Sequence, residues 1–167
     1  FWMRAALSAL TFSLSLHAAP AVAQPARGLE QKDEFAKRYR MGDESDERAR
    51  VGKARAHPLT FATPEQAFLS WQASIVRSSK PDYLECLHPD FRAKEYPKGA
   101  EHYIKNVDYV KYWYLAMYAT YEGSDVKGDA AELKVVFSLR GADGTVQQQH
   151  ARYELRRDKG RWLFASR

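Results

Sequence analysis

The sequence has one cysteine, Cys86, among its 167 residues, so no disulfide can form within the chain. Exported proteins usually carry paired cysteines or none. A cysteine that anchors a lipid directly follows the signal segment at the start of a chain. Cys86 lies far beyond the first 23 residues, so it cannot have that role. Its neighbours Tyr83, Leu84 and Leu87 are apolar, so we expect a buried, unreactive thiol.

Motifs for metal binding and nucleophilic catalysis are missing as well. The sequence contains no His-x-x-x-His, Cys-x-x-Cys or Gly-x-Ser-x-Gly spacing, and its nine glycines are scattered at turns. We therefore expect no metal site, no cofactor and no phosphate-binding loop. The five histidines are isolated from one another: His17, His57, His88, His102 and His150.

Long runs of like charge and long apolar runs are also absent after the first segment. The net charge of +5 comes from 26 basic and 21 acidic residues that are spread widely. We expect no nucleic-acid partner, because no run of five or six like charges occurs. No segment after residue 23 is apolar enough to insert in a membrane, so we expect no transmembrane segment in the mature chain.

Residues 1–23 are typical of a cleaved signal peptide. Arg4 precedes the apolar run Ala5 to Leu16, and Ala21-Val22-Ala23 fits the small-x-small cleavage pattern. The run is too short for a spanning helix of about 20 residues. We expect cleavage after Ala23 and a periplasmic or secreted protein. Since the chain begins Phe1-Trp2, Met3 is the expected initiator.

Residues 24–62 differ in composition from the rest of the chain. Between Arg27 and Arg55 they carry nine basic and seven acidic residues but few large apolar groups. Such a segment buries too little apolar surface to offset its ordering entropy. We predict a charged flexible arm, whose residues 48–55 either contact anionic lipid or cell-wall polymer or form a solvated linker.

The folded domain is predicted to span residues 63–167 and to begin with helices. Thr63-Pro64-Glu65-Gln66 is a helix start with a capping hydroxyl, and Phe68, Trp71 and Ile75 recur at helical spacing. Lys80-Pro81 opens a second, short helix, and residues 92–99 read as irregular. Residues 99–108 are predicted to form a third helix.

We predict a strand from Tyr109 to Val126, although Ala116, Met117 and Ala119 would also suit a helix. In a strand, three tyrosines would share the outward face. That face would be a contact surface, for a partner or for a homodimer through the sheet, or would pack against a loop. The three residues are Tyr112, Tyr114 and Tyr118.

Residues 131–166 are typical of three antiparallel strands. Leu133, Val135 and Phe137 alternate with polar residues, which indicates a strand with one buried face. Turns are predicted at residues 127–129, 141–144 and 158–160, where glycine supplies the positive φ that tight hairpins require. Helices followed by strands predict an α+β fold with the helices on one face of an antiparallel sheet.

These features resemble the nuclear transport factor 2-like superfamily, and in particular its exported bacterial members. The resemblance covers residues 63–167. It rests on the capped first helix, the Tyr-x-x-x-Leu-His-Pro-Asp-Phe segment at 83–91 and the closing Gly-Arg-Trp-Leu-Phe strand. It implies a curved sheet that wraps a long helix into a cone, a cystatin-like roll that often holds a ligand pocket. It also implies two function classes, binding modules and small-molecule isomerases, cyclases or dehydratases.

Catalysis in such a cone would need an inward carboxylate or imidazole near a tyrosine. His102 and Asp108 are the candidates, but six residues of helix place them on nearly opposite faces. His150 is expected to point away from the interior. We therefore predict a non-catalytic binding or accessory domain for a small apolar ligand or a partner protein. The enzymatic alternative stays open.

Overall fold

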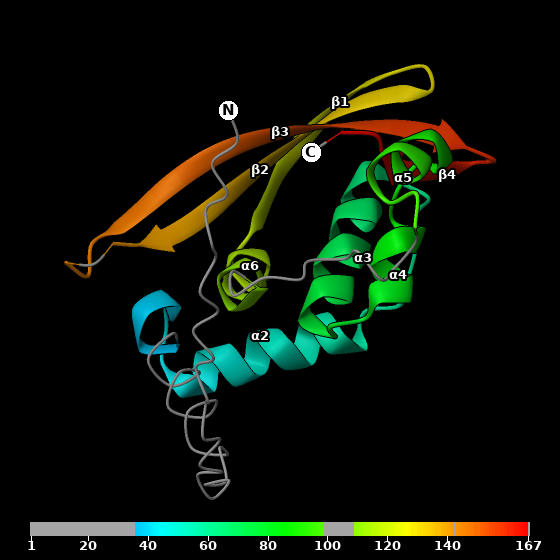
Figure 1. Ribbon diagram of the computed structural model, residues 1–167. Helices are drawn as coiled ribbons and strands as arrows, with labels where there is room; N and C mark the ends of the chain where they lie inside the picture. The colour runs from blue at the N-terminus through cyan, green and yellow to red at the C-terminus, as the bar shows by residue number, and fades with distance from the viewer. Residues whose placement is uncertain (1–35, 99–108, 142, 167) are drawn as a thin grey trace, which may run out of the picture.

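The computed structural model describes residues 36–98, 109–141 and 143–166. In these ranges the chain is an α+β protein, in which helices precede a four-stranded antiparallel sheet (Figure 1). The predicted fold class is thus confirmed at this level. The elements are α2 (Glu44–Ala56), α3 (Pro64–Val76), α4 (Lys80–Glu85), α5 (Pro89–Glu95), α6 (Tyr109–Met117), β1 (Thr120–Lys127), β2 (Ala130–Arg140), β3 (Val146–Asp158) and β4 (Arg161–Phe164).

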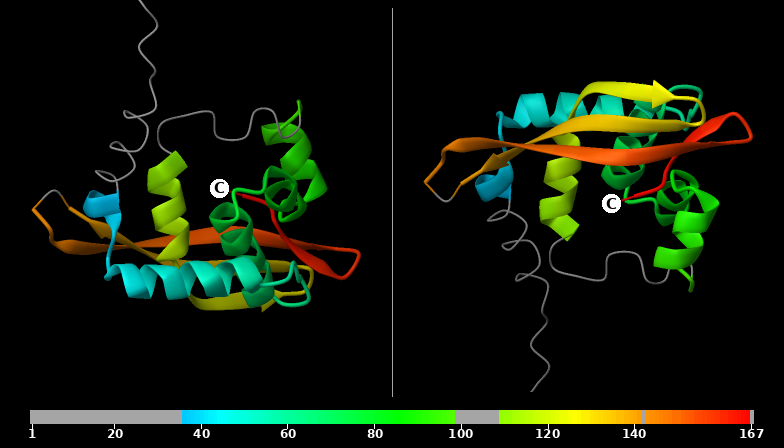
Figure 2. Two further views of the ribbon diagram at one scale, coloured as in Figure 1. Left: turned by 90° about the horizontal axis from the view of Figure 1, so that it is seen from below. Right: turned by 90° about the horizontal axis from the view of Figure 1, so that it is seen from above.

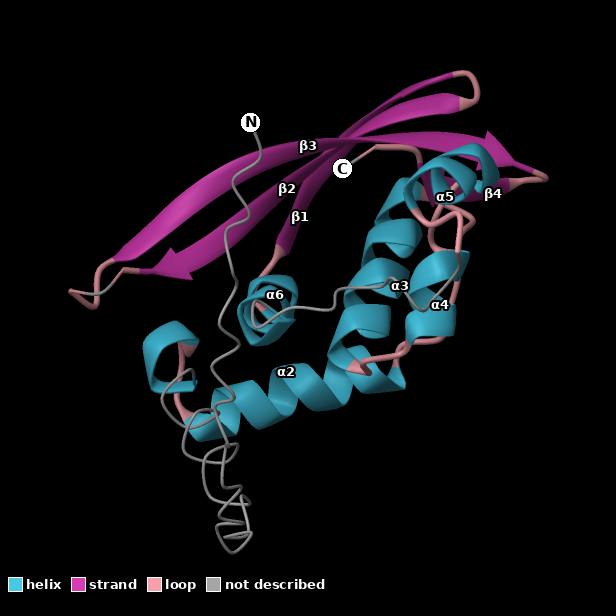
Figure 3. Ribbon diagram, in the orientation of Figure 1, coloured by secondary structure: helices cyan, strands magenta, loops and turns pink. Residues whose placement is uncertain are grey.

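The four strands form a meander in the order β1-β2-β3-β4 (Figure 3). The three predicted turns connect them. Gly128 has a φ of 60° between β1 and β2, while Lys159 and Gly160 have φ of 50° and 80° between β3 and β4. Positive φ at two successive residues matches the right-handed twist of the paired strands.

β1 is an edge strand that pairs with β2, and a bulge interrupts their register between Tyr121 and Gly123. Gly123 has a φ of 144°, which residues with a side chain rarely adopt. A bulge of this kind bends the strand and increases its local twist.

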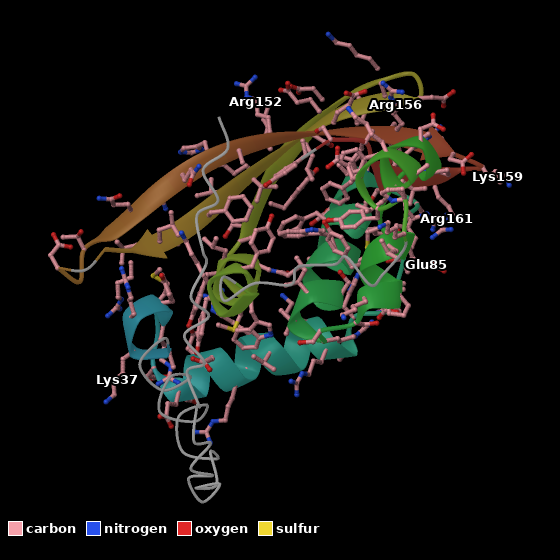
Figure 4. The ribbon with its side chains drawn as sticks, in the orientation of Figure 1. Lys37, Glu85, Arg152, Arg156, Lys159 and Arg161 are labelled. Carbon is pink, nitrogen blue, oxygen red and sulfur yellow. The ribbon has the colours of Figure 1, made fainter. Side chains whose placement is uncertain are left out.

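The helices lie on one face of the sheet. They are in front of the strands in the view from below and behind them in the view from above (Figure 2). Leu133, Val135 and Leu155 are buried on this inner face. The outer face carries ion pairs instead, such as Arg152 with Glu132, whose Nη1–Oε1 distance is 3.1 Å. Arg152 projects from β3 away from the helices (Figure 4).

α3 begins as predicted. The hydroxyl of Thr63 accepts a hydrogen bond from the Gln66 amide at 3.2 Å, and Pro64 occupies the first turn. Trp71 packs under the sheet with its ring centroid 6.3 Å from that of Phe137. The predicted apolar face of this helix is therefore the one that builds the core.

The segment after α3 is more helical than expected. α4 begins at Lys80, as predicted, but α5 (Pro89–Glu95) includes part of the stretch that we read as irregular. Nδ1 of His88 caps α5 by accepting a hydrogen bond from the Asp90 amide at 3.4 Å, and Pro89 takes the first helical position. The predicted third helix, at 99–108, lies outside the described residues.

The prediction of a strand from residue 109 is wrong for its first half. Tyr109–Met117 is helix α6, and the strand begins at Thr120. Tyr114, Met117 and Tyr118 follow helical spacing of three and four and are buried together. Burial of this stripe against the N-terminal segment and α3 outweighs the strand preference of the aromatic residues.

The described part of the predicted flexible arm, residues 36–62, contains a helix of 13 residues. Residues 44–56 form α2, which begins where Asp43 caps the Asp46 amide at 2.8 Å. A second small hydrophobic core attaches this segment to the domain. A hydrogen bond adds to it, because the Gly42 amide donates to the Tyr118 hydroxyl at 3.3 Å. The members of this core are Ala54, Val76, Tyr114, Met117 and Tyr118, with Ala36, Tyr39, Met41, Val51 and Trp113 packed around them.

In the described part of the chain, no helix combines the length and the apolar character that crossing a membrane requires.

Candidate functional site

An aromatic cluster fills the space between α3 and the inner face of the sheet. Trp71 lies at its centre, with ring centroids 6.3 Å from Phe137 and 6.1 Å from Phe164. Tyr153 closes the arrangement, because its ring is 6.4 Å from Phe137 and 5.8 Å from Phe164. The contacts of Phe137 with Trp71 and of Tyr153 with both phenylalanines are edge to face, and such contacts add stability beyond the area that they bury. We call these four residues the aromatic cluster.

The cluster is not evenly covered. Trp71 and Phe164 are buried, with exposed fractions of 9% and 4%. Phe137 and Tyr153 are only half-buried, although they face the same interior. These two residues therefore keep part of their surface accessible beside a packed interior, and an apolar molecule could contact them there.

Tyr153 brings a polar group to this surface. Burial, with a smaller contribution from Tyr112, raises the pKa of Tyr153 to about 12. The hydroxyl is therefore protonated at neutral pH and can donate a hydrogen bond. None of the hydrogen bonds found among the described residues involves this hydroxyl. A carbonyl or hydroxyl oxygen of a ligand could accept this hydrogen bond.

A pair of tyrosines, Tyr83 and Tyr96, joins the two short helices beside the aromatic cluster. The hydroxyls of Tyr83 and Tyr96 are 3.2 Å apart and buried, and their rings meet edge to face at 5.9 Å. Tyr83 belongs to α4 and Tyr96 follows α5, so the pair joins these two short helices. Arg161 of β4 and Glu85 of α4 form an ion pair at 3.2 Å on the outside of the same region (Figure 4).

The structure separates the three tyrosines that we expected on one face. Tyr112 is exposed at 43%, whereas Tyr114 and Tyr118 are buried. The Tyr114 hydroxyl donates to Glu47 at 3.5 Å, and the Tyr118 ring lies 5.1 Å from the guanidinium of Arg50. Tyr114 and Tyr118 thus form an interface with α2 of their own chain, and Tyr112 lies near Tyr153.

The remaining candidates divide between confirmed and untested. His102 and Asp108 lie outside the described residues. His150 projects from the outer face, as expected, and its Nδ1 is 3.1 Å from Glu122. Cys86 is fully buried, and its burial raises the pKa of the thiol to about 12. The expected burial is confirmed, and a thiol with a raised pKa forms little of the reactive thiolate at neutral pH.

Sequence reasoning missed a cavity of about 230 Å³ beside α2, which we call the α2 hollow. It lies between α2, α3 and the junction of α6 with β1. The hollow is lined by three residues of α2 and by its C-cap residue. Their helical spacing of three and four was the sequence pattern that could have indicated a common face. They are Arg50, Lys53, Ala54 and His57.

Within residues 36–98, 109–141 and 143–166 no group of three or more histidine, cysteine, aspartate or glutamate side chains could hold a metal ion.

Comparison of the sequence with protein-family models gives no match, and comparison with curated proteins also gives none. Among solved structures, the chain is similar to the solution structure of a SEC-C motif-containing protein from Rhodopseudomonas palustris. The sequence identity is 22% and the TM-score is 0.47. The likeness covers 70% of this chain and 85% of that chain. A likeness at this level assigns neither a family nor a function to the chain.

Proposed function

We propose that the chain is an exported, non-catalytic domain that binds a small apolar or amphipathic ligand against the aromatic cluster. The observation that supports this proposal most is the partial exposure of Phe137 and Tyr153. The other two members of the cluster, Trp71 and Phe164, are buried. Ligand sites are mostly apolar surfaces with a few placed polar groups. The Tyr153 hydroxyl is such a group, because it is held protonated among rings.

The proposal includes the fold family. Helices on one face of a four-stranded meander that bends over them support the cone-shaped, cystatin-like roll of the nuclear transport factor 2-like superfamily (Figure 1). In that arrangement the aromatic cluster lines the inside of the cone.

The environment of Tyr153 favours binding over catalysis. Proton transfer needs a base or acid within hydrogen-bond reach of the reacting group, with a suitable pKa. Burial and another tyrosine, Tyr112, are what shift the pKa of Tyr153. No carboxylate or imidazole of the described residues contributes to this shift. Tyr153 can therefore orient a carbonyl by donating a hydrogen bond to it.

Two fluorescent probes of similar size test the proposal on the full chain. Both 2-acetylnaphthalene, a ketone, and 2-ethylnaphthalene, which lacks the carbonyl, should bind saturably. Tyr153→Phe should weaken the binding of the ketone only. A net hydrogen bond of about 0.5–1.5 kcal/mol corresponds to roughly two- to tenfold weaker binding. Tyr118→Phe is the matched control, because its hydroxyl belongs to the second core. Absence of saturable binding by either probe would contradict the proposal.

The same ketone separates binding from catalysis. Its methyl protons exchange with deuterium when a base removes them, and NMR in D₂O follows that exchange. We expect the exchange rate of the bound ketone to equal the buffer rate. Exchange that the protein accelerates, and that His102→Ala or Asp108→Ala abolishes, would favour the isomerase-type alternative instead.

Export is tested separately. The periplasmic fraction of cells that express the full chain should contain a form that begins at Gln24. An N-terminal sequence that retains the apolar segment from Ala5 to Leu16 would contradict the signal-peptide part of the proposal.

A further inference from the structure

The α2 hollow is a separate cavity from the surface at Phe137 and Tyr153. One wall is α2, a second is formed by Phe68, Leu69 and Gln72 of α3, and the third is the junction of α6 with β1. Its volume of about 230 Å³ exceeds the ~150 Å³ of an engineered cavity that binds benzene. One aromatic ring with a polar head group therefore fits.

The charge of the lining has one sign. Arg50 and Lys53 line the hollow, and none of its lining residues is a carboxylate. Arg50 is already paired with Asp46 at 2.9 Å. None of the ion pairs found among the described residues involves Lys53, which is exposed at the mouth. The ammonium of Lys53 is therefore the free charge at this site.

One imidazole atom of His57, a residue that lines the hollow, lacks a partner among the described residues. Nε2 of His57 is buried and makes no hydrogen bond to the described residues. Burial and the nearby Arg77 lower the pKa of His57, so the ring is neutral at pH 7. A buried polar atom that stays unsatisfied destabilises the folded state. A turn of the ring that opened Nε2 to the hollow would let a ligand acceptor satisfy it, in the tautomer that carries its proton there.

The ends of two helices bear on the charge of the ligand. α2 and α6 both end at this hollow, and the carbonyl end of a helix repels anions. Several carbonyl groups at and just beyond these helix ends are occupied, however. Arg77 donates to the carbonyl oxygens of Arg55 and His57, and Gln72 donates to those of Ala116 and Ala119 at 2.7 and 3.2 Å. Arg77 also adds positive charge close to the imidazole.

From this combination we infer that the α2 hollow binds a small monoanion with an apolar body, such as an aromatic carboxylate. The apolar body contacts Phe68, Leu69 and Met117. The carboxylate pairs with Lys53 and accepts the hydrogen bond of His57. Phosphate esters fit less well, because a second negative charge would face a single free cation.

Benzoate and its neutral isostere benzamide are the probes, and NMR of the full chain is the assay. Benzoate should shift the signals of the His57 ring, the Ala54 methyl and the Met117 methyl in a saturable way. Exposed ion pairs contribute about 0.2–1 kcal/mol. Lys53→Gln should therefore weaken the binding of benzoate up to about fivefold and leave the affinity for benzamide unchanged. Added salt should weaken benzoate in the same selective way.

Lys159→Gln is the control, since this lysine lies in the β3–β4 turn, away from α2 (Figure 4). It should change neither affinity. Equal affinity for benzoate and benzamide, or an equal effect of the two lysine variants, would overturn the inference. So would shifts confined to the aromatic cluster, or no saturable shift at all. None of these outcomes bears on the naphthalene probes, which report on Tyr153.

Discussion

The contribution of Trp71 to stability follows from its position at the centre of the aromatic cluster. Its side chain belongs to the largest type, which buries about 150–250 Å², and it is 9% exposed. At about 25 cal/mol per Å² the burial is worth about 4–6 kcal/mol. Measured losses for large aromatic residues replaced by alanine are about 3–5 kcal/mol. We expect Trp71→Ala to lower the free energy of unfolding by that amount.

Urea unfolding followed by far-UV circular dichroism measures this loss without relying on tryptophan fluorescence. The midpoint should fall while the slope with urea stays constant, because the surface exposed on unfolding hardly changes. The melting temperature should fall by about 2–4 °C for each kcal/mol. Trp71→Phe should lose less, since it keeps a ring against Phe137.

Val126→Ala is the control for this series, since Val126 is 51% exposed on β1. Its effect should stay within about 1 kcal/mol, the span of strand preferences. A loss below about 1 kcal/mol for Trp71→Ala would show that this face of α3 does not form the core.

Three further predictions concern other parts of the molecule. Tyr118→Ala removes the contacts to Gly42 and Arg50. Trypsin should therefore cut within α2 roughly 5–30-fold faster, as expected for a loss of one or two kcal/mol; an unchanged rate would refute the docking role of Tyr118. Cys86, with its pKa raised to about 12, should react with a thiol reagent at pH 8 only after unfolding, and rapid native labelling would contradict its burial. The pKa of His57 is lowered in the folded state, so the unfolded chain binds more protons and stability should fall as pH drops below about 6.5. His57→Gln should reduce this slope, and an unchanged slope in urea titrations at several pH values would refute it.

The sheet could be predicted because its signals are local. Leu133 and Val135 alternate with polar neighbours, and Gly128 and Gly160 supply the positive φ that the turns need. Each of these choices is decided by a few adjacent residues. Long-range packing then agrees with them, so strand pairing and register follow the sequence pattern.

The segment that became α6 carries two periodicities at once. Trp113, Leu115 and Met117 alternate as in a strand, while Tyr114, Met117 and Tyr118 follow helical spacing. The helical stripe decides the outcome, because it finds Ala54 of α2 and Val76 of α3 to pack against. Those partners are distant in sequence, so a local pattern could not identify them.

The order of α2 has the same origin. Composition alone indicates a segment that cannot fold by itself, and its apolar contacts are indeed few. It is held by Tyr114 of α6, which contacts Glu47, and by Tyr118, which directly follows α6 and contacts Arg50. The α2 hollow could not be anticipated from the sequence, because Lys53, Gln72 and Thr120 line it from three separate segments.

The bulge on β1 has a consequence for solubility. An edge strand offers unpaired backbone groups to any other chain, and long flat edges promote aggregation. β1 is bent at Gly123 and carries the charged residues Glu122, Asp125 and Lys127, which make the approach of another strand unfavourable. A residue with a side chain at Gly123 would strain the backbone there. Straightening of this edge would follow, and the folded protein would then lose solubility at concentrations where it is still stable.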